Sequence, residues 1–173
     1  KFLMRYENLE FYEALRVLAE RAGVELKTVS PEDQRQFGII YDLNNAAAEF
    51  FEDALKNSKG ANEYIKKRGL KEETIAEFMV GFAPAEFDEL TVHLINMGFA
   101  IEDIVRAGLT IKTERGRYLD RFRGRVMFPI HNHFGKVVGF SGRILPEFDK
   151  GDAGKYINSP DTPIFNKSRL LYG

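Results

Sequence analysis

The segment RFRGRVMFPI, residues 121–130, decides the fold class because its pattern repeats every two residues rather than at helical spacing. Side chains of an extended chain alternate between two faces, so residues two apart share a face at about 6.6 Å. This spacing predicts a strand whose half-buried face carries Phe122, Val126, Phe128 and Ile130. The opposite face would carry Arg121, Arg123 and Arg125.

The charges around this segment are one-sided. Residues 121–146 contain five basic side chains and no Asp or Glu, although the chain has 26 acidic residues. Like charges in a row repel one another unless anions lie beside them. The neutralising groups must therefore come from another part of the fold or from a ligand.

The chain divides into two parts of opposite charge. Residues 1–110 hold 13 basic and 20 acidic residues, whereas residues 111–173 hold 12 basic and 6 acidic residues. This asymmetry indicates that the C-terminal third faces a polyanion. The alternative is that the two parts simply attract each other.

Composition excludes several classes of protein. The 173 residues are 44% hydrophobic and 13% aromatic, enough for a folded core. No apolar run approaches the roughly 20 residues that span a bilayer, and the charged opening KFLMRYENLEF does not fit a secretory signal. The absence of cysteine excludes a disulfide, a thiol nucleophile and a cysteine zinc site. We expect a cytoplasmic protein without membrane contact, and a chain that is a piece of a longer one.

Helical signals fill the first part of the chain. Asn8 can cap an amphipathic segment that stops at Gly23, and Ser30-Pro31 begins a second helix that runs to about Asn57. Shorter helices are predicted to end where Gly is followed by an apolar residue. These stops are Gly69-Leu70, Gly98-Phe99 and Gly108-Leu109.

From about residue 109 the pattern changes to that of strands. RVMFPIHN and GKVVGFSGRIL predict two strands joined by a turn. Pro129 cannot donate a ladder hydrogen bond, so its strand should lie at an edge or carry a bulge. Residues 146–173, rich in Pro, Gly, Asp and Asn, predict a structured loop. The predicted fold class is α+β, with a helical layer followed by a small basic antiparallel sheet and that loop.

The triplet HNH at residues 131–133 does not predict a metal or nuclease site. Adjacent residues in a tight turn cannot converge on one ion, and the remaining histidine, His93, is remote in sequence. We predict no metal ligand in this chain.

A basic surface with interleaved tyrosines remains. Guanidinium and ammonium groups beside aromatic rings suit phosphates with stackable bases, as in single-stranded nucleic acid or nucleotides. The alternative is a protein interface or self-pairing. The side chains concerned are Arg115, Arg117, Arg121, Arg123, Arg125, Arg143, Lys155 and Lys167, with Tyr118 and Tyr156.

Two stretches, DRFRGRVMFPIHNHFGKVVGFSGRIL and GKYINSPDTPIFNKSRLLYG, resemble the amino-terminal part of the RNA-polymerase domain of bacterial-type DNA primases. YIKKRGLKEETIAEFMVGFAP resembles the helical part of that region, and KFLMRYENLEFYEALRVLAERAGVEL the helical tail that follows the family's zinc ribbon. The resemblance implies three parts: residues 1–27 as this tail and a linker, 28–110 as the helical part of the catalytic core, and 111–173 as its basic β part.

The resemblance also implies roles for single residues, since this family joins ribonucleotides on a single-stranded DNA template. Catalytic roles fall on Arg143, Lys155 and Lys167, and nucleotide binding on these residues with Tyr156 and Asn158. DNA binding falls on Arg68, Arg121, Arg123 and Arg125. Arg68 could instead neutralise a helix C-terminus, and Arg123 and Arg125 could be ordinary surface charges.

The cofactors and further partners implied by the resemblance lie outside this chain. Mg or Mn would be held by carboxylates of a Toprim domain, and zinc by the zinc ribbon. The partners would be a single-stranded DNA template, ribonucleoside triphosphates, the RNA primer and a replicative helicase contacted elsewhere. We therefore expect this fragment alone to be inactive. The alternative function is a non-catalytic module that binds single-stranded nucleic acid or docks a partner.

Overall fold

The structure, a computed structural model, describes residues 18–23, 31–132, 134–151 and 154–167. The chain forms two compact units, residues 1–34 and 35–173. In the first unit, residues 18–22 are helical and Gly23, with a φ of 64°, ends the helix as predicted. The rest of that predicted helix and the predicted boundary near residue 27 lie outside the described residues.

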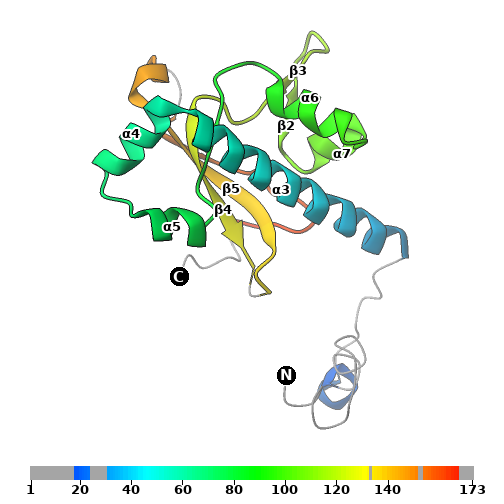
Figure 1. Cartoon of the computed structure of the whole chain (residues 1–173). Helices are drawn as coiled ribbons and strands as arrows, with labels where there is room; N and C mark the ends of the chain where they lie inside the picture. Colours follow the sequence, from blue (N-terminus) through cyan, green and yellow to red (C-terminus); the bar gives the residue numbers. More distant parts are fainter. Residues whose placement is uncertain (1–17, 24–30, 133, 152–153, 168–173) are drawn as a thin grey trace. The chain divides into compact units, whose positions relative to one another are not determined.

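The elements appear in the order α3, α4, α5, β1, α6, α7, β2, β3, β4, β5, η1, β6 (Figure 1). The helices are α3 (Pro31–Asn57), α4 (Lys59–Lys67), α5 (Glu72–Glu77), α6 (Glu89–Asn96), α7 (Ile101–Arg106) and the 3-10 helix η1 (Pro146–Phe148). The strands are β1 (Gly81–Ala83), β2 (Thr110–Lys112), β3 (Tyr118–Asp120), β4 (Arg125–His131), β5 (Val137–Ile144) and β6 (Tyr156–Asn158). The α+β class, the long helix from Pro31 and the two main strands are confirmed.

The main sheet is antiparallel in the order β1-β4-β5-β6, and β2 and β3 form a separate hairpin. β1 pairs only with Arg125–Met127, so the half of β4 that contains Pro129 has an open edge on that side. The register also shifts between Ile130 and His131, which confirms the prediction of an edge or a bulge. The prediction of a loop without strands after residue 145 is wrong for β6, which pairs with β5.

One face of the main sheet, here called the inner face, packs against α3. It carries Met127, Phe140 and Ile157 in the largest hydrophobic cluster. Gly81 lies so close to α3 that a Cβ atom there would stand 2.5 Å from the Cβ of Phe51. The rings of Phe51 and Phe140 meet edge to face at 5.4 Å. The apolar stripe of α3 therefore covers the arginine side of β4, because Arg125 and Met127 share this face.

The opposite face, here called the outer face, is only partly covered. Its side chains are Val126, Phe128, Ser141, Arg143, Tyr156 and Asn158, as the strand register requires. Val126 is buried in a second cluster with residues of α4 and the end of α3, including Leu55 and Ile65. Tyr156 is 53% exposed. The β5–β6 part of the outer face therefore remains open to solvent.

The predicted helix ends after α4, α6 and α7 are confirmed. Gly69, Gly98 and Gly108 have φ values between 73° and 96°. After α4, for example, the N–H of Gly69 donates to the carbonyl of Lys66 and that of Leu70 to the carbonyl of Ile65. This pair of hydrogen bonds satisfies carbonyls that the helix leaves open.

Asp120, at the end of β3, joins the hairpin to α6. Its carboxylate accepts hydrogen bonds from the backbone N–H groups of Leu90 at 2.8 Å and Thr91 at 2.9 Å, and from the Thr91 hydroxyl. These groups lie in the first turn of α6, so Asp120 caps that helix from another element. Burial raises the pKa of Asp120, although these hydrogen bonds act to lower it. The N–H of Asp120 also donates to the carbonyl of Phe87 at 2.7 Å, which fixes the loop before α6.

Candidate nucleotide and nucleic-acid interface

The predicted row of three arginines on one strand face is wrong. β4 begins only at Arg125, and residues 121–124 form an irregular segment that crosses from the hairpin to the main sheet. The turn depends on Gly124, whose φ is 59° and whose missing side chain leaves room for Phe148, 2.7 Å from where a Cβ would stand. Phe122 packs with Met127 on the inner face and not with Val126. The three arginines therefore point to different surroundings.

Arg125 is buried rather than presented on an open face. The side chain is 4% exposed, and its Nη1 donates to the carbonyls of Gly142 at 3.2 Å and Gly154 at 3.0 Å. Burial lowers the pKa of this guanidinium, and the charge of Asp149 acts in the opposite direction. Arg125 thus ties β4 to β5 and to the residue before Lys155.

Arg121 and Arg123 lie beside an exposed phenylalanine. Together they line a cleft of about 320 Å³, whose other charged and aromatic residues are Phe87, Arg125, Glu147, Phe148 and Lys150. Arg123 donates to the carbonyl of Asp120 at 2.8 Å, and its guanidinium lies 5.7 Å from the centroid of the Phe87 ring. Phe87 is 67% exposed. A base could stack on such a ring while the cations bind the backbone of the strand.

Arg121 has one nitrogen whose hydrogen-bonding capacity is not used. Its Nε is buried and has no hydrogen-bond partner among the described residues. Burial lowers the pKa of its guanidinium, but arginine stays protonated in proteins. A buried donor without a partner costs about 1–3 kcal/mol. An anion in the cleft beside Arg121 would recover that cost.

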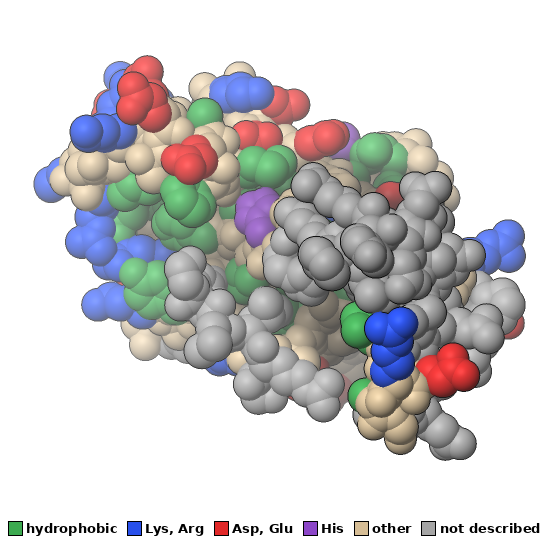
Figure 2. Space-filling view, turned by 90° about the horizontal axis from the view of Figure 1, so that it is seen from below, with side chains coloured by type: hydrophobic (Ala, Val, Ile, Leu, Met, Phe, Trp, Pro, Cys, Tyr) green, Lys and Arg blue, Asp and Glu red, His purple; other side chains and the backbone are tan. Residues whose placement is uncertain are grey.

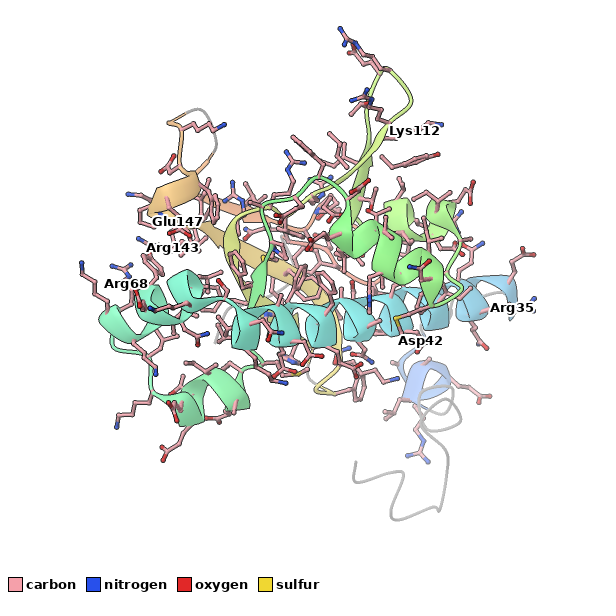
Figure 3. All side chains as sticks on the ribbon, turned by 45° about the horizontal axis from the view of Figure 1, so that its top comes forward. Arg35, Asp42, Arg68, Lys112, Arg143 and Glu147 are labelled. Atoms are coloured by element: carbon pink, nitrogen blue, oxygen red, sulfur yellow. The ribbon has the colours of Figure 1, made fainter. Side chains whose placement is uncertain are left out.

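A second group of cations and tyrosines lies on the open part of the outer face and on α4. Arg143 donates a hydrogen bond to the Tyr156 hydroxyl, and its guanidinium lies 5.0 Å from the centroid of the Tyr156 ring. Burial acts to lower the pKa of Arg143, but the hydroxyls of Tyr156 and Tyr64 raise it more. Arg68, the C-cap of α4, lies 5.9 Å from the ring of Tyr64. Figure 3 shows Arg68 and Arg143 at the same end of the protein.

A cavity of about 470 Å³ adjoins this group, and we call it the outer-face cavity. The sheet supplies Phe128, Ser141, Tyr156 and Asn158, while α5 and its flanks supply Leu70, Thr74, Phe78 and Val80. Two predicted nucleotide-binding residues, Tyr156 and Asn158, thus line one cavity.

The lysines predicted to act with Arg143 are both exposed. The carbonyl of Lys155 accepts from the N–H of Ile144 at 3.0 Å, so its backbone continues the pairing of β5 with β6. The N–H of Lys167 donates to the Asp161 carboxylate at 3.1 Å. No contact described for the side chains of Lys155 and Lys167 joins them to Arg143, and their convergence on one phosphate stays a prediction.

Three aromatic residues of these clusters were not predicted. Tyr64 precedes Arg68 by four residues, a spacing that places both on one helix face. Phe87 lies in the loop AEFDE and Phe78 at the end of α5. An exposed aromatic ring in a loop carries no periodic signal, so only the fold brings these rings to the cations.

Two further kinds of feature are absent from the part of the chain that the structure describes. Within the described ranges, no group of three or more His, Asp or Glu side chains could hold a metal ion. None of the described helices is long and apolar enough to cross a membrane.

The fold and these two clusters define a class: an α+β domain whose surface clusters of cations and aromatic rings are of a kind that suits nucleotides or nucleic acid. Residues 50–173 match the family model of the DNA primase catalytic core, N-terminal domain. The chain therefore belongs to the DNA primase family, and the family resemblance of the sequence is confirmed.

Similar proteins agree with this assignment. The chain is 41% identical over 173 residues to the DNA primase of Deinococcus radiodurans, covering 99% of this chain and 29% of that protein. A DnaG primase catalytic domain bound to single-stranded DNA matches with a TM-score of 0.71 and 40% identity, over 80% of this chain and 44% of that one. The zinc-binding and RNA polymerase domains of the Aquifex aeolicus primase match with a TM-score of 0.67 and 30% identity, over 96% of this chain and 39% of that one.

Proposed function

We propose that this chain is the template- and nucleotide-holding wall of an enzyme that joins ribonucleotides into short RNA primers on single-stranded DNA. The chain spans about 29% of the Deinococcus relative, so the polymerase activity is proposed for the intact protein. The observation that carries the proposal is the cleft of Arg121, Arg123 and Phe87, in which a half-buried arginine whose buried Nε has no described partner lies beside a second guanidinium and an exposed ring.

Within this proposal the cleft holds the template. Arg121 and Arg123 bind phosphates of the backbone, and Phe87 stacks on a base. Contacts of this kind position a strand without reading its sequence. Arg125 takes no direct part, because both described contacts of its guanidinium are to backbone carbonyls. We propose a supporting role for it instead.

The outer-face group holds the incoming nucleotide. Arg143 binds a triphosphate, with Lys155 and Lys167 supplied from the loop around β6, while Tyr156 orients the Arg143 guanidinium. Arg68 adds charge from α4, next to Tyr64. Preorganised cations act on charge that develops in the transition state, so these residues contribute to rate more than to template affinity.

The metal ions of such a reaction do not fit the described residues near Arg143. The side chains that interact with Arg143 or line the adjoining cavity offer the hydroxyls of Tyr64, Tyr156 and Ser141 and the amide of Asn158, whereas Mg²⁺ prefers several carboxylates. We propose that Mg or Mn is held by carboxylates outside this chain, where it would offset the charge of the reacting phosphates. Zinc, for which this chain has no cysteine, would also bind elsewhere.

The remaining partners follow from the same proposal. The enzyme would use ribonucleoside triphosphates, release an RNA primer and contact a replicative helicase through a region outside this chain. Its place would be the cytoplasm, where bacterial chromosomes are copied. The second candidate function is a module that only binds single-stranded nucleic acid or a partner.

An Arg143→Ala substitution in the intact protein separates these functions. We expect primer synthesis at saturating template to fall by about 10²–10³, while the dissociation constant for a single-stranded oligonucleotide changes little. Ribonucleotide incorporation and fluorescence anisotropy measure the two quantities. No synthesis by the unmodified protein would favour the binding module, whereas unchanged synthesis by the variant would remove Arg143 from the nucleotide site.

A further inference from the structure

The outer-face cavity has the size and composition of a small-molecule site. Its volume of about 470 Å³ lies within the range of ligand pockets, which are mostly apolar with a few placed polar groups. Phe78, Val80 and Phe128 supply apolar surface, and Ser141 and Asn158 supply polar atoms. Figure 2 shows exposed hydrophobic side chains bordered by Lys and Arg on the side of α4 and α5.

The α5 wall of this cavity is held by a strained turn. Met79 has a φ of 50°, which lies in the left-handed region that residues other than glycine rarely adopt. The N–H of Met79 donates to Ala76 and that of Val80 to Ile75, so the helix closes tightly here. The turn leaves Phe78 at the cavity rim, 53% exposed, and buries Val80. Backbone strain of this kind persists only where the surrounding contacts hold the residue in its strained conformation.

The polar groups of the cavity lie next to the proposed triphosphate site. Ser141 pairs with Asn158 across β5 and β6, and Arg143 pairs with Tyr156 two residues further along the same face. Residues two apart on one strand face are separated by about 6.6 Å, a gap that one sugar ring can bridge. The cavity therefore opens directly beside the cations that would hold the phosphates.

The Asn158 amide can both donate and accept hydrogen bonds, as the edge of a nucleobase does. An apolar side chain in the same cavity would leave the Asn158 amide and the Ser141 hydroxyl without partners, which costs free energy. A flat heteroaromatic ring satisfies the polar edge and the apolar walls together.

We propose that the outer-face cavity binds the base of the ribonucleotide whose triphosphate lies against Arg143, with Phe78 and Phe128 in contact with the ring and Ser141 and Asn158 at its edge. This inference rests on the proposed nucleotide site and adds a base subsite built partly by α5. It makes residues of the helical part of the chain determinants of nucleotide affinity.

The test compares two ligands on the intact primase: ATP, and ribose 5-triphosphate, which lacks the base. A base stacked on an aromatic side chain contributes about 1–3 kcal/mol, so ATP should bind about 5- to 150-fold more tightly. Thr74→Trp fills the cavity, and Phe78→Ala removes an exposed wall. Both substitutions should abolish most of the ATP advantage and leave the affinity for ribose 5-triphosphate unchanged. Phe134→Ala, an exposed ring on the β4–β5 turn, is the matched control and should keep the full advantage.

Equal affinities of the unmodified enzyme for the two ligands would overturn the proposal, as would an ATP advantage that survives in Phe78→Ala. Unchanged binding of ribose 5-triphosphate reports that a variant is folded, and where Thr74→Trp fails that check, Phe78→Ala decides. Failure of the proposed nucleotide site has a different signature. In that case Arg143→Ala would weaken neither ligand, whatever the cavity variants do.

Discussion

Replacing Arg125 distinguishes a buried structural arginine from a phosphate-binding one. In Arg125→Met the apolar stem is kept, and the hydrogen bonds to the carbonyls of Gly142 and Gly154, 3.2 and 3.0 Å long, are lost. A hydrogen bond to a charged group contributes about 1.5–3 kcal/mol. The carbonyl of Gly154 belongs to an exposed residue and can be rehydrated, so we expect a total loss of about 2–3 kcal/mol.

This loss should be visible as a lower melting temperature. For a chain of this size, 1 kcal/mol corresponds to about 2–4 °C, so Arg125→Met should melt roughly 4–12 °C below the unmodified protein. In the intact enzyme the loop that carries Lys155 would be loosened, and a small misplacement can reduce the rate by about tenfold or more. Template affinity should change little.

Arg123→Met is the matched control, because Arg123 lies in the template cleft over the exposed ring of Phe87. It should weaken template binding and shift the melting temperature only slightly. Thermal melting monitored by circular dichroism, with anisotropy of a labelled single strand, measures both quantities for each variant. If Arg125→Met melts like the unmodified protein and loses template affinity, Arg125 is a phosphate contact and its proposed supporting role is wrong.

Four further outcomes are expected. The Arg121→Ala, Arg123→Ala double variant should flatten the dependence of log affinity on log salt by about 1.4, at roughly 0.7 per single-strand phosphate, and an unchanged slope would remove both residues from the template site. Asp120→Ala should lower the free energy of unfolding by about 1–3 kcal/mol in urea titrations, since two N–H groups of α6 lose their acceptor. The pKa of Asp120 is raised in the folded state. At pH values between the unfolded and the folded pKa, the Asp120 carboxyl is therefore protonated in the folded chain and ionised in the unfolded chain. The free energy of unfolding should therefore decrease as pH rises through that interval, and Asp120→Asn should lack this change. The 173-residue chain alone, with Mg²⁺ or Mn²⁺, template and four ribonucleotides, should form no dinucleotide, and template-dependent product would refute the division of roles.

The sequence predicted a helix boundary correctly where that boundary depends only on residues next to it. The start of α3 at Pro31 and the ends of helices at Gly69 and Gly98 depend on a few adjacent residues, and all were predicted. The strand Tyr156–Asn158 depends on pairing with β5 and lies among Pro, Gly and Asp residues. No local pattern marks it, and the outer-face cavity that it lines could not be predicted either.

The prediction that Arg121, Arg123 and Arg125 share one strand face is wrong for a related physical reason. A period of two tells which side chains share a face, but not which face another element covers. Here α3 covers the face that holds Arg125 and Met127. The left-handed turn at Gly124 also ends the alternation before it reaches Arg121 and Arg123.

The missing carboxylates of residues 121–146 thus have a different explanation from the one that the sequence favoured. Backbone carbonyl oxygens take the place of carboxylates as hydrogen-bond acceptors, since Arg123 donates to Asp120 and Arg125 to Gly142 and Gly154. Of the three arginines, Arg121 alone has a buried nitrogen without a partner among the described residues. An unsatisfied buried donor costs free energy. This cost is recovered when an anion from outside these residues accepts a hydrogen bond from Arg121. Among alanine substitutions of the three arginines, Arg121→Ala should therefore reduce template affinity while costing the least stability, since it removes the donor that has no described partner.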